Sequence, residues 1–341
     1  MRWSRTESES FFSSSTTMTS LWLRCEKKPF ERRAALTPTT AKTLLDAGFA
    51  VTVERDEQRI FADSEYEASL IATKIRLAGL KCWRDSIAGG GTLYDLEFLT
   101  DPSGRRVAAF GFHAGFAGAA AGALAIASQK KGETLGALEP YENEAAMVAG
   151  VKAALGGSGN GIKALVIGAL GRCGRGAVDL FRKIGVAEDD ILKWDLDETA
   201  KGGPFDEILG VDVFVNCIYL NTSIPPFITR ERIAAAGQGR RLSVVVDVSC
   251  DTTNPFNPIP IYNINTTFPE PTVPVVLGAD CPQLSVISID HLPTLLPREA
   301  SEQFSRDLLP SLLEYPQGRV WSDAERLFKT KVAEAASVEG L

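Results

Sequence analysis

The segment from residue 163 to residue 195 constrains the fold more than any other part of the chain. It begins with an apolar run (KALVI), continues through a glycine-rich turn and a helix-like stretch (GALGRCGRGAVDLF), and reaches a second apolar run (ILKW) before Asp195. A buried strand, a tight turn, an amphipathic helix and a second strand in this order are typical of a parallel α/β unit. The segment therefore predicts part of a Rossmann-like, nucleotide-binding domain.

Three glycines, Gly168, Gly171 and Gly174, shape the predicted turn. Residues without a Cβ let the backbone bend sharply and approach a pyrophosphate, and the helix N-terminus then offers free N–H groups to the phosphates. Asp195 follows about 20 residues later, where an acid accepts hydrogen bonds from an adenosine ribose and repels a 2′-phosphate, which favours NAD over NADP. The spacing is Gly-x-x-Gly-x-x-Gly instead of Gly-x-Gly-x-x-Gly, so a glycine turn without a nucleotide stays open as an alternative.

Length and composition limit the broad class of protein. A chain of 341 residues, 45% hydrophobic and 23% charged, has room for two globular domains. Its net charge of −7 argues against nucleic acid or an anionic membrane as a partner, and we see no apolar run of about 18 residues that would span a membrane. The six cysteines have neither metal-ligand spacing nor a disulfide framework. We therefore expect a cytoplasmic enzyme with reduced thiols and no metal.

The first part of the chain predicts a second α/β unit. Residues 1–20 are rich in serine and threonine, and we expect a disordered N-terminal extension there. Strands are predicted at 21–26 and 49–55, joined by a helix that begins with Thr37 as N-cap before Pro38 and ends at Gly48. Residues 107–112 predict a further strand, and the small residues from 114 to 127 predict a closely packed helix.

The second part of the chain has a regular strand pattern. Strand-like runs recur at 163–167, 191–194, 211–218, 242–248 and 285–289. Such runs predict a doubly wound parallel sheet with ligands at the carboxyl ends of its strands. Residues 299–341 predict helices that pack back on the first domain. The predicted domains are thus 21–112 together with 299–341, the substrate domain, and 113–298, the NAD-binding Rossmann domain.

Several long motifs resemble those of a known family. They are RAALTP at 33–38, GTLYDLEFL at 91–99, GRRVAAFGF at 104–112, AGFAG at 114–118, IGALGRCG at 167–174, VDVS at 246–249 and SIDHLP at 288–293. In these motifs the chain resembles NAD-dependent, lysine-forming saccharopine dehydrogenases, which belong to an alanine dehydrogenase/transhydrogenase-like superfamily. The resemblance implies two Rossmann-like α/β domains with parallel sheets, an active site in the cleft between them, and a monomer. It also implies oxidation of saccharopine by NAD and hydrolysis to lysine and 2-oxoglutarate, the last step of lysine biosynthesis through α-aminoadipate.

The resemblance assigns substrate contacts to individual positions. These are Arg33, Arg106, Phe110, Ser249, Cys250 and Asp251. Arginine binds a carboxylate as a bidentate fork, which suits a multiply charged amino acid such as saccharopine. Glu97 matches an active-site acid that tunes neighbouring ionisations. For the arginines and for Glu97, an ordinary ion pair is the alternative interpretation.

The resemblance also assigns cofactor contacts. These are Arg105, Gly168, Gly171, Arg172, Asp195, Thr199, Tyr219, Val248, Ile289, Asp290, His291 and Leu292. His291 is predicted to be structural rather than catalytic, since a histidine beside a strand end often only hydrogen-bonds the backbone. Cys173 and Cys217 occupy positions that lie close together in the family, so the resemblance implies that they could form a disulfide, although reduced thiols are the default in the cytoplasm.

The chain departs from the family between Tyr66 and Gly91, where several tens of residues are missing. In the family this stretch supplies a lysine base, an acid beside it, a histidine proton donor and a glutamine that contacts substrate. Lys81, in a Gly-Leu-Lys sequence, matches the lysine, Cys82 stands where the acid would be, and the chain's two histidines lie elsewhere. Positioned acid–base groups contribute about 10²–10⁴-fold to rate. We therefore expect NAD binding with slow turnover of saccharopine. A catalytically impaired NAD-binding relative and an alanine-dehydrogenase-like oxidoreductase are the alternatives.

Overall fold

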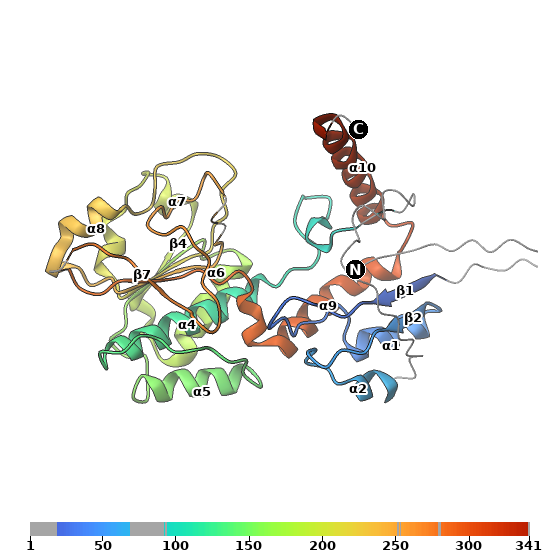
Figure 1. Ribbon diagram of the computed structural model, residues 1–341, viewed down its shortest axis with the longest axis horizontal. Coiled ribbons are helices and arrows are strands. Elements are labelled where there is room, and N and C mark those ends of the chain that lie inside the picture. Colours follow the sequence, from blue (N-terminus) through green and yellow to red (C-terminus); the bar gives the residue numbers. More distant parts are fainter. Residues whose placement is uncertain are drawn as a thin grey trace, which may run out of the picture. The chain divides into compact units, whose positions relative to one another are not determined.

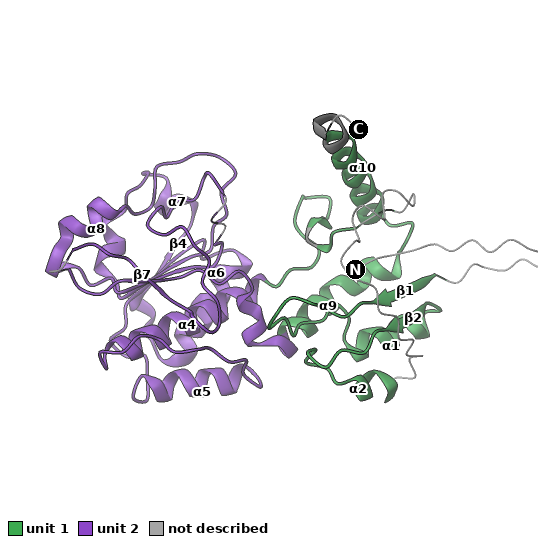
Figure 2. Ribbon diagram, in the orientation of Figure 1, with its two compact units in different colours: residues 1–110, 300–341 green, residues 111–299 purple. Residues whose placement is uncertain are grey.

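The computed structural model describes residues 19–68, 92, 94–250, 252, 254–278 and 281–339. The chain divides into two compact units, residues 1–110 with 300–341 and residues 111–299 (Figure 2). The chain therefore passes from unit 1 to unit 2 after Phe110 and returns after Glu299. Lys81 and Asp251 lie outside the described residues, as does the whole of the predicted extension before residue 19.

Unit 2 is an α/β domain built on one sheet (Figure 1). Its strands are β3 (Ala164–Ile167), β4 (Ile191–Trp194), β5 (Val213–Asn216), β6 (Val244–Asp247), β7 (Val273–Pro274) and β8 (Ser285–Ile287), in the order β4-β3-β5-β6-β8-β7. The five predicted strands are confirmed and pair in parallel. A sixth strand that the sequence analysis did not predict, β7, adds to one edge and pairs antiparallel with β8. With two residues, one of them a proline, β7 leaves no strand pattern in the sequence and is tolerated because it is an edge.

Helices and 3-10 turns connect these strands. They are α4 (Gly111–Gln129), α5 (Glu144–Ala154), α6 (Arg172–Ile184), η2 (Glu188–Asp190), α7 (Leu196–Thr199), η3 (Asp206–Gly210), α8 (Arg230–Ala236), η4 (Gly237–Gly239) and η5 (Leu292–Leu295). Alternate residues of each central strand point to opposite faces of the sheet. Val166, Val215 and Val246 join the core beneath α4, α5 and α6, whereas Ile167 and Phe214 join the core beneath η3 and α8.

The run of small residues predicted as a closely packed helix is confirmed as α4. A Cβ on Gly115 would lie 1.8 Å from the Cys173 carbonyl oxygen, and one on Gly176 of α6 would lie 1.9 Å from the Phe112 carbonyl oxygen. The two helices therefore touch backbone to backbone. Among the described helices, only α4 is long and apolar enough to span a membrane, yet 72% of its apolar window is buried. Core helices pass the same test, and the packing of α4 on α6 and the sheet matches that case.

Unit 1 combines both ends of the chain. Its described elements are β1 (Ser20–Leu23), α1 (Pro38–Asp46), β2 (Ala50–Val53), α2 (Asp63–Ala68), η1 (Leu96–Phe98), α9 (Pro297–Leu313), which begins in unit 2, and α10 (Arg319–Glu339). The predicted strand–helix–strand order is confirmed, and β1 and β2 pair in parallel. Thr37 caps α1 through a capping box with Thr40, and Gly48 follows the helix with φ +89°.

The C-terminal helices pack on unit 1, as predicted. Leu308 and Trp321 share a core with Leu21 of β1 and Val51 of β2. The predicted strand at 107–112, however, is wrong. Arg106 forms only an isolated bridge with Thr100, and the chain enters α4 at residue 111. Apolar residues there pack elsewhere, as Phe110 does on Phe304 of α9, so a short apolar run does not require a sheet partner.

Candidate functional site

The glycine turn has the geometry of a phosphate-binding loop. Gly168 follows β3 with φ +84°, a conformation that favours glycine, and a Cβ on Gly174 would lie 2.1 Å from the Gly168 carbonyl oxygen. Gly171 is the N-cap of α6 and, as a glycine, makes no side-chain capping hydrogen bond. The positive end of the dipole of this 13-residue helix lies at the glycine turn and favours an anion there.

Asp195 lies beside this turn, at the end of β4. Its Oδ2 accepts a hydrogen bond from the Leu170 N–H (3.0 Å) and its Oδ1 one from the Leu196 N–H (3.1 Å). Thr199 donates its hydroxyl hydrogen to the Asp195 carbonyl oxygen (2.7 Å). The structure therefore brings Gly168, Gly171, Asp195 and Thr199 together at the carboxyl edge of the sheet. Each Asp195 oxygen retains a second lone pair for a ribose hydroxyl.

The loops after β5 and β6 lie at the same edge. Tyr219 is exposed, Val248 and Ser249 are half-buried, and Cys250 is buried. Beneath them lies a polar cluster that the sequence analysis missed: Asn216, Asp247 and Tyr262 are all buried and hydrogen-bonded to one another through Asp247. A signal was present, since Asn216 and Asp247 are polar residues that end two strongly apolar strands.

The segment 289–292 follows β8. Ile289 and Leu292 are 1% exposed and belong to the core beneath α4, so their backbone is the part that could contact a cofactor. Asp290 is exposed, and its Oδ1 contacts Nδ1 of His291. The His291 ring is buried and lies edge-on to Phe268, with the centroids 4.7 Å apart. These contacts hold the ring by the Asp290 carboxylate and the Phe268 ring, and the structural role of His291 stays a prediction.

Cys173 and Cys217 are close, but the implied disulfide is not present. Both are free cysteines. A hydrogen bond to Cys173, together with burial, raises the pKa of the Cys217 thiol well above its ordinary value. Because a disulfide requires oxidation of both sulfurs, proximity alone leaves a pair of thiols joined by a weak hydrogen bond.

In unit 1 the structure brings two predicted substrate residues together. The Arg33 guanidinium carbon lies 4.2 Å from the centre of the Phe110 ring, which in turn stacks on Phe304 of α9 at 4.3 Å. Glu31, which sequence reasoning missed, accepts hydrogen bonds from Nε (2.8 Å) and Nη2 (2.6 Å) of Arg33. Glu31 therefore orients the guanidinium and uses two of its donors, and the Nη1 end is the part left for a carboxylate.

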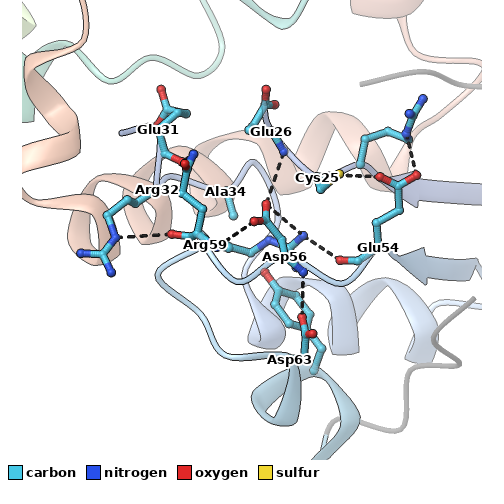
Figure 3. A network of polar contacts seen from close by, with 12 residues as sticks. Cys25, Glu26, Glu31, Arg32, Ala34, Glu54, Asp56, Arg59 and Asp63 are labelled. Carbon is cyan, nitrogen blue, oxygen red and sulfur yellow. Dashed lines mark hydrogen bonds and ion pairs between the residues drawn. The ribbon is translucent and has the colours of Figure 1, made fainter. Parts of the chain in front are cut away.

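Unit 1 contains a network of polar contacts that includes Glu26, Asp56 and Arg59 (Figure 3). Arg59 is buried and donates to the Glu54 carbonyl oxygen (2.8 Å), while Asp56 accepts from the Glu26 and Gln58 N–H groups. A cavity of about 80 Å³ lies among these residues. It is lined by Leu23, Arg24, Glu26, Arg33, Ala34, Ala35, Asp56, Arg59 and Leu96. Arg33 thus faces a small polar cavity.

Two hydroxyl groups of α9 fix the backbone on both sides of Leu36. The Ser301 Oγ accepts from the Ala34 N–H (2.9 Å) and the Ser305 Oγ from the Thr37 N–H (3.1 Å). Both serines are fully buried. The position of Arg33 therefore depends on contacts across more than 260 residues of sequence.

The remaining predicted residues include Arg172, which directly follows Gly171 of the glycine turn. Arg105 and Arg106 are exposed in the turn that Asp101 stabilises through the Arg105 N–H (3.0 Å), and Arg172 is half-buried in the first turn of α6. Glu97 lies within η1. Among the described residues we find no group of three His, Cys, Asp or Glu side chains that could hold a metal.

Comparison with known proteins identifies the family. Saccharopine dehydrogenase [NAD(+), L-lysine-forming] of Emericella nidulans is 49% identical over 92% of this chain and 97% of that protein. The proteins of the same name from Yarrowia lipolytica and Schizosaccharomyces pombe are 50% and 49% identical, again over 92% of this chain, and are covered over 97% and 98% of their lengths. The chain belongs to the saccharopine dehydrogenase family.

More distant comparisons agree in fold. Residues 22–74 match the family model of the alanine dehydrogenase/PNT N-terminal domain. An L-alanine dehydrogenase structure has a TM-score of 0.61 at 14% identity, covering 91% of this chain and 94% of that one. The transhydrogenase from Sinorhizobium meliloti has a TM-score of 0.58 at 16% identity, with 90% and 97% covered. The predicted α/β class with Rossmann-like domains is thereby confirmed.

The members of the saccharopine dehydrogenase family also contain residues that this chain lacks. The alignment with the Emericella nidulans protein spans 366 positions, although the whole chain has 341 residues. Residues missing from this chain are thereby shown, and their place between Tyr66 and Gly91 stays a prediction.

Proposed function

We propose that the protein is an NAD-dependent, lysine-forming saccharopine dehydrogenase, in which saccharopine, NAD and water yield lysine, 2-oxoglutarate and NADH. The single observation that carries this proposal is the identity of about half of all aligned residues with proteins of that name over almost their whole length. The glycine turn, with its helix N-terminus beside Asp195, supports a dinucleotide as cofactor.

In this proposal unit 2 binds NAD and unit 1 binds the substrate. The N-terminus of α6 and the Gly168 turn hold the pyrophosphate, and Asp195 accepts from the adenosine ribose, which favours NAD over NADP. NAD, when bound, supplies the hydride acceptor. Arg33, oriented by Glu31 and lying over Phe110, binds a substrate carboxylate through its Nη1 end.

Proton transfer is the part of the reaction that the described residues do not explain. Hydrolysis of the imine requires proton donors and acceptors at the carbinolamine and at the leaving amine. In the family these groups come from the stretch around Lys81 that is shortened here. We therefore propose that the 341-residue chain binds NAD and substrate but hydrolyses slowly.

The test is to follow NADH absorbance with the purified chain, in parallel with saccharopine and with alanine, and to titrate NAD and NADP by calorimetry. We expect NAD to bind more tightly than NADP, and NADH to form with saccharopine only. Turnover of alanine without turnover of saccharopine would overturn the proposal, as would an absence of NAD binding.

A further inference from the structure

Asp247 is a buried carboxylate with no role in the function proposed above. It is the last residue of β6 and is 2% exposed. Its Oδ1 accepts from Nδ2 of Asn216 (3.0 Å) and from the Ser249 N–H (3.2 Å), and its Oδ2 accepts from the Tyr262 hydroxyl (2.7 Å). A carboxylate only accepts hydrogen bonds, so three segments of unit 2 converge on one acceptor group.

The contacts continue from Asn216 into the loop after β5. Asn216 donates from Nδ2 to the Ile218 carbonyl oxygen (3.1 Å) and accepts at Oδ1 from the Ile218 N–H (3.2 Å). Ile218 packs directly against the glycine turn, because a Cβ on Gly168 would lie 2.9 Å from its Cγ1. Asp247 is thereby connected to the loops after β6 and β5 and, through Ile218, to the turn after β3.

Burying the Asp247 carboxylate costs folding free energy, but its hydrogen bonds fix the geometry of the loops around it. Burial raises the pKa of Asp247, while the hydrogen bonds from Tyr262, Asn216 and the loop N–H groups oppose that change. Apolar side chains of the same volume would fill the space without this cost. Hydrogen bonds, unlike apolar packing, fix the direction of each loop, since they weaken steeply away from linear geometry.

We propose that Asp247 is a positioning residue for the nicotinamide cofactor: its carboxylate holds the loops after β5 and β6, and through Ile218 the glycine turn, in the arrangement that receives the dinucleotide. The inference rests on the proposed function, because it assumes that NAD binds at this edge. Asp247 itself touches no ligand in this scheme. It acts on the loop that carries Val248 and Ser249 and on the loop that carries Tyr219.

The experiment measures the dissociation constant of NAD by calorimetry, with the full chain and two matched variants. Asp247→Ala removes the acceptor at the carboxyl edge of the sheet. Asp212→Ala removes a second aspartate at the opposite edge, where its Oδ2 accepts from the Lys163 N–H (2.7 Å) and from Nη2 of Arg241 (2.7 Å). Thermal unfolding of each variant reports stability separately from binding.

We expect Asp247→Ala to raise the dissociation constant of NAD about 10- to 100-fold, because buried donors lose their acceptor and the loops lose their fixed arrangement. Asp212→Ala should lower the unfolding temperature without changing NAD affinity. A folded Asp247→Ala protein that binds NAD like the wild type would overturn the inference. So would an equal loss of affinity in both variants, which would indicate a general loss of stability. Failure of the unaltered chain to bind NAD would instead overturn the proposed function.

If Asp247→Ala does not fold, Tyr262→Phe tests the positioning role of Asp247 instead. It removes the hydrogen bond to Oδ2 and keeps the ring in place. We expect a rise of about three- to tenfold in the NAD dissociation constant. Unchanged affinity in this variant would contradict a positioning role for the cluster.

Discussion

The two units of the molecule differ in how far along the chain their contacts reach. Unit 2 is one continuous stretch, and its glycine turn is held by neighbours such as Trp194, whose carbonyl oxygen accepts from the Gly168 and Ala169 N–H groups (2.8 and 3.0 Å). Unit 1 joins the two ends of the chain (Figure 2), and Ser301 and Ser305 fix the segment around Arg33. The comparison teaches that the proposed cofactor site is specified within a continuous part of the sequence, whereas the position of Arg33, the proposed substrate residue, depends on distant parts of it.

An insertion in unit 1 is expected to give the largest effect and tests whether the two units act separately. The sequence predicts that acid–base residues are missing between Tyr66 and Gly91. On that prediction, inserting a family member's stretch at this place should raise turnover of saccharopine by about 10²–10⁴-fold. NADH absorbance measures the rate. Calorimetry with NAD is the control, and its dissociation constant should not change, because unit 2 is unaltered. Equal turnover by the two chains would show that the inserted residues are not needed.

Helix packing in unit 2 gives the next largest effect. Gly176→Ala should lower the free energy of unfolding by about 1–3 kcal/mol, because its Cβ would lie 1.9 Å from the Phe112 carbonyl oxygen and force α4 and α6 apart. Gly210→Ala is the control, as a Cβ there meets no atom within 4 Å. Denaturant unfolding should place that variant within about 0.5 kcal/mol of the wild type. Equal losses in both would contradict the backbone contact between the helices.

A substitution of Asp195 tests the proposed cofactor site in unit 2. Asp195→Ala should raise the dissociation constant of NAD about tenfold and narrow the preference over NADP, because the ribose loses an acceptor and a 2′-phosphate loses a repelling charge. Asp197→Ala, an exposed acid of the same short helix, is the control. Calorimetry with both dinucleotides measures the effect. Unchanged NAD affinity in Asp195→Ala would show that Asp195 does not contact the cofactor.

The smallest effect is electrostatic and lies on the surface of unit 2. Hydrogen bonds from Arg182 and Lys193 lower the pKa of Glu188 from 4.5 to about 2. A lowered pKa of an acid means stabilisation that is present above pH 4.5 and is lost as the pH falls toward 2. Glu188→Gln should therefore lower the unfolding temperature slightly at pH 7, and the difference should shrink below pH 4.5. A difference independent of pH, or one matched by Asp189→Asn, would contradict this assignment.

The sequence by itself determined the elements whose signals are local. The caps of α1, the five parallel strands and the glycine turn before α6 follow from residues that lie within a few positions of one another. Asp195 could be placed beside the turn for the same reason, because a strand–turn–helix–strand unit brings its two strand ends together. The long motifs then led to the family, which the comparisons confirm.

Only the tertiary structure decided which distant groups meet. Residues 107–112 have a strand-like pattern, but they lie in no described strand, and the last two form the start of α4. Glu31 and Phe110 orient Arg33, and Asp247 connects Asn216 with Tyr262. The physical reason is that a buried polar group must find its partner in three dimensions. A polar residue at the end of an apolar strand indicates that a hydrogen-bond partner is needed. Only the fold determines which residue that partner is.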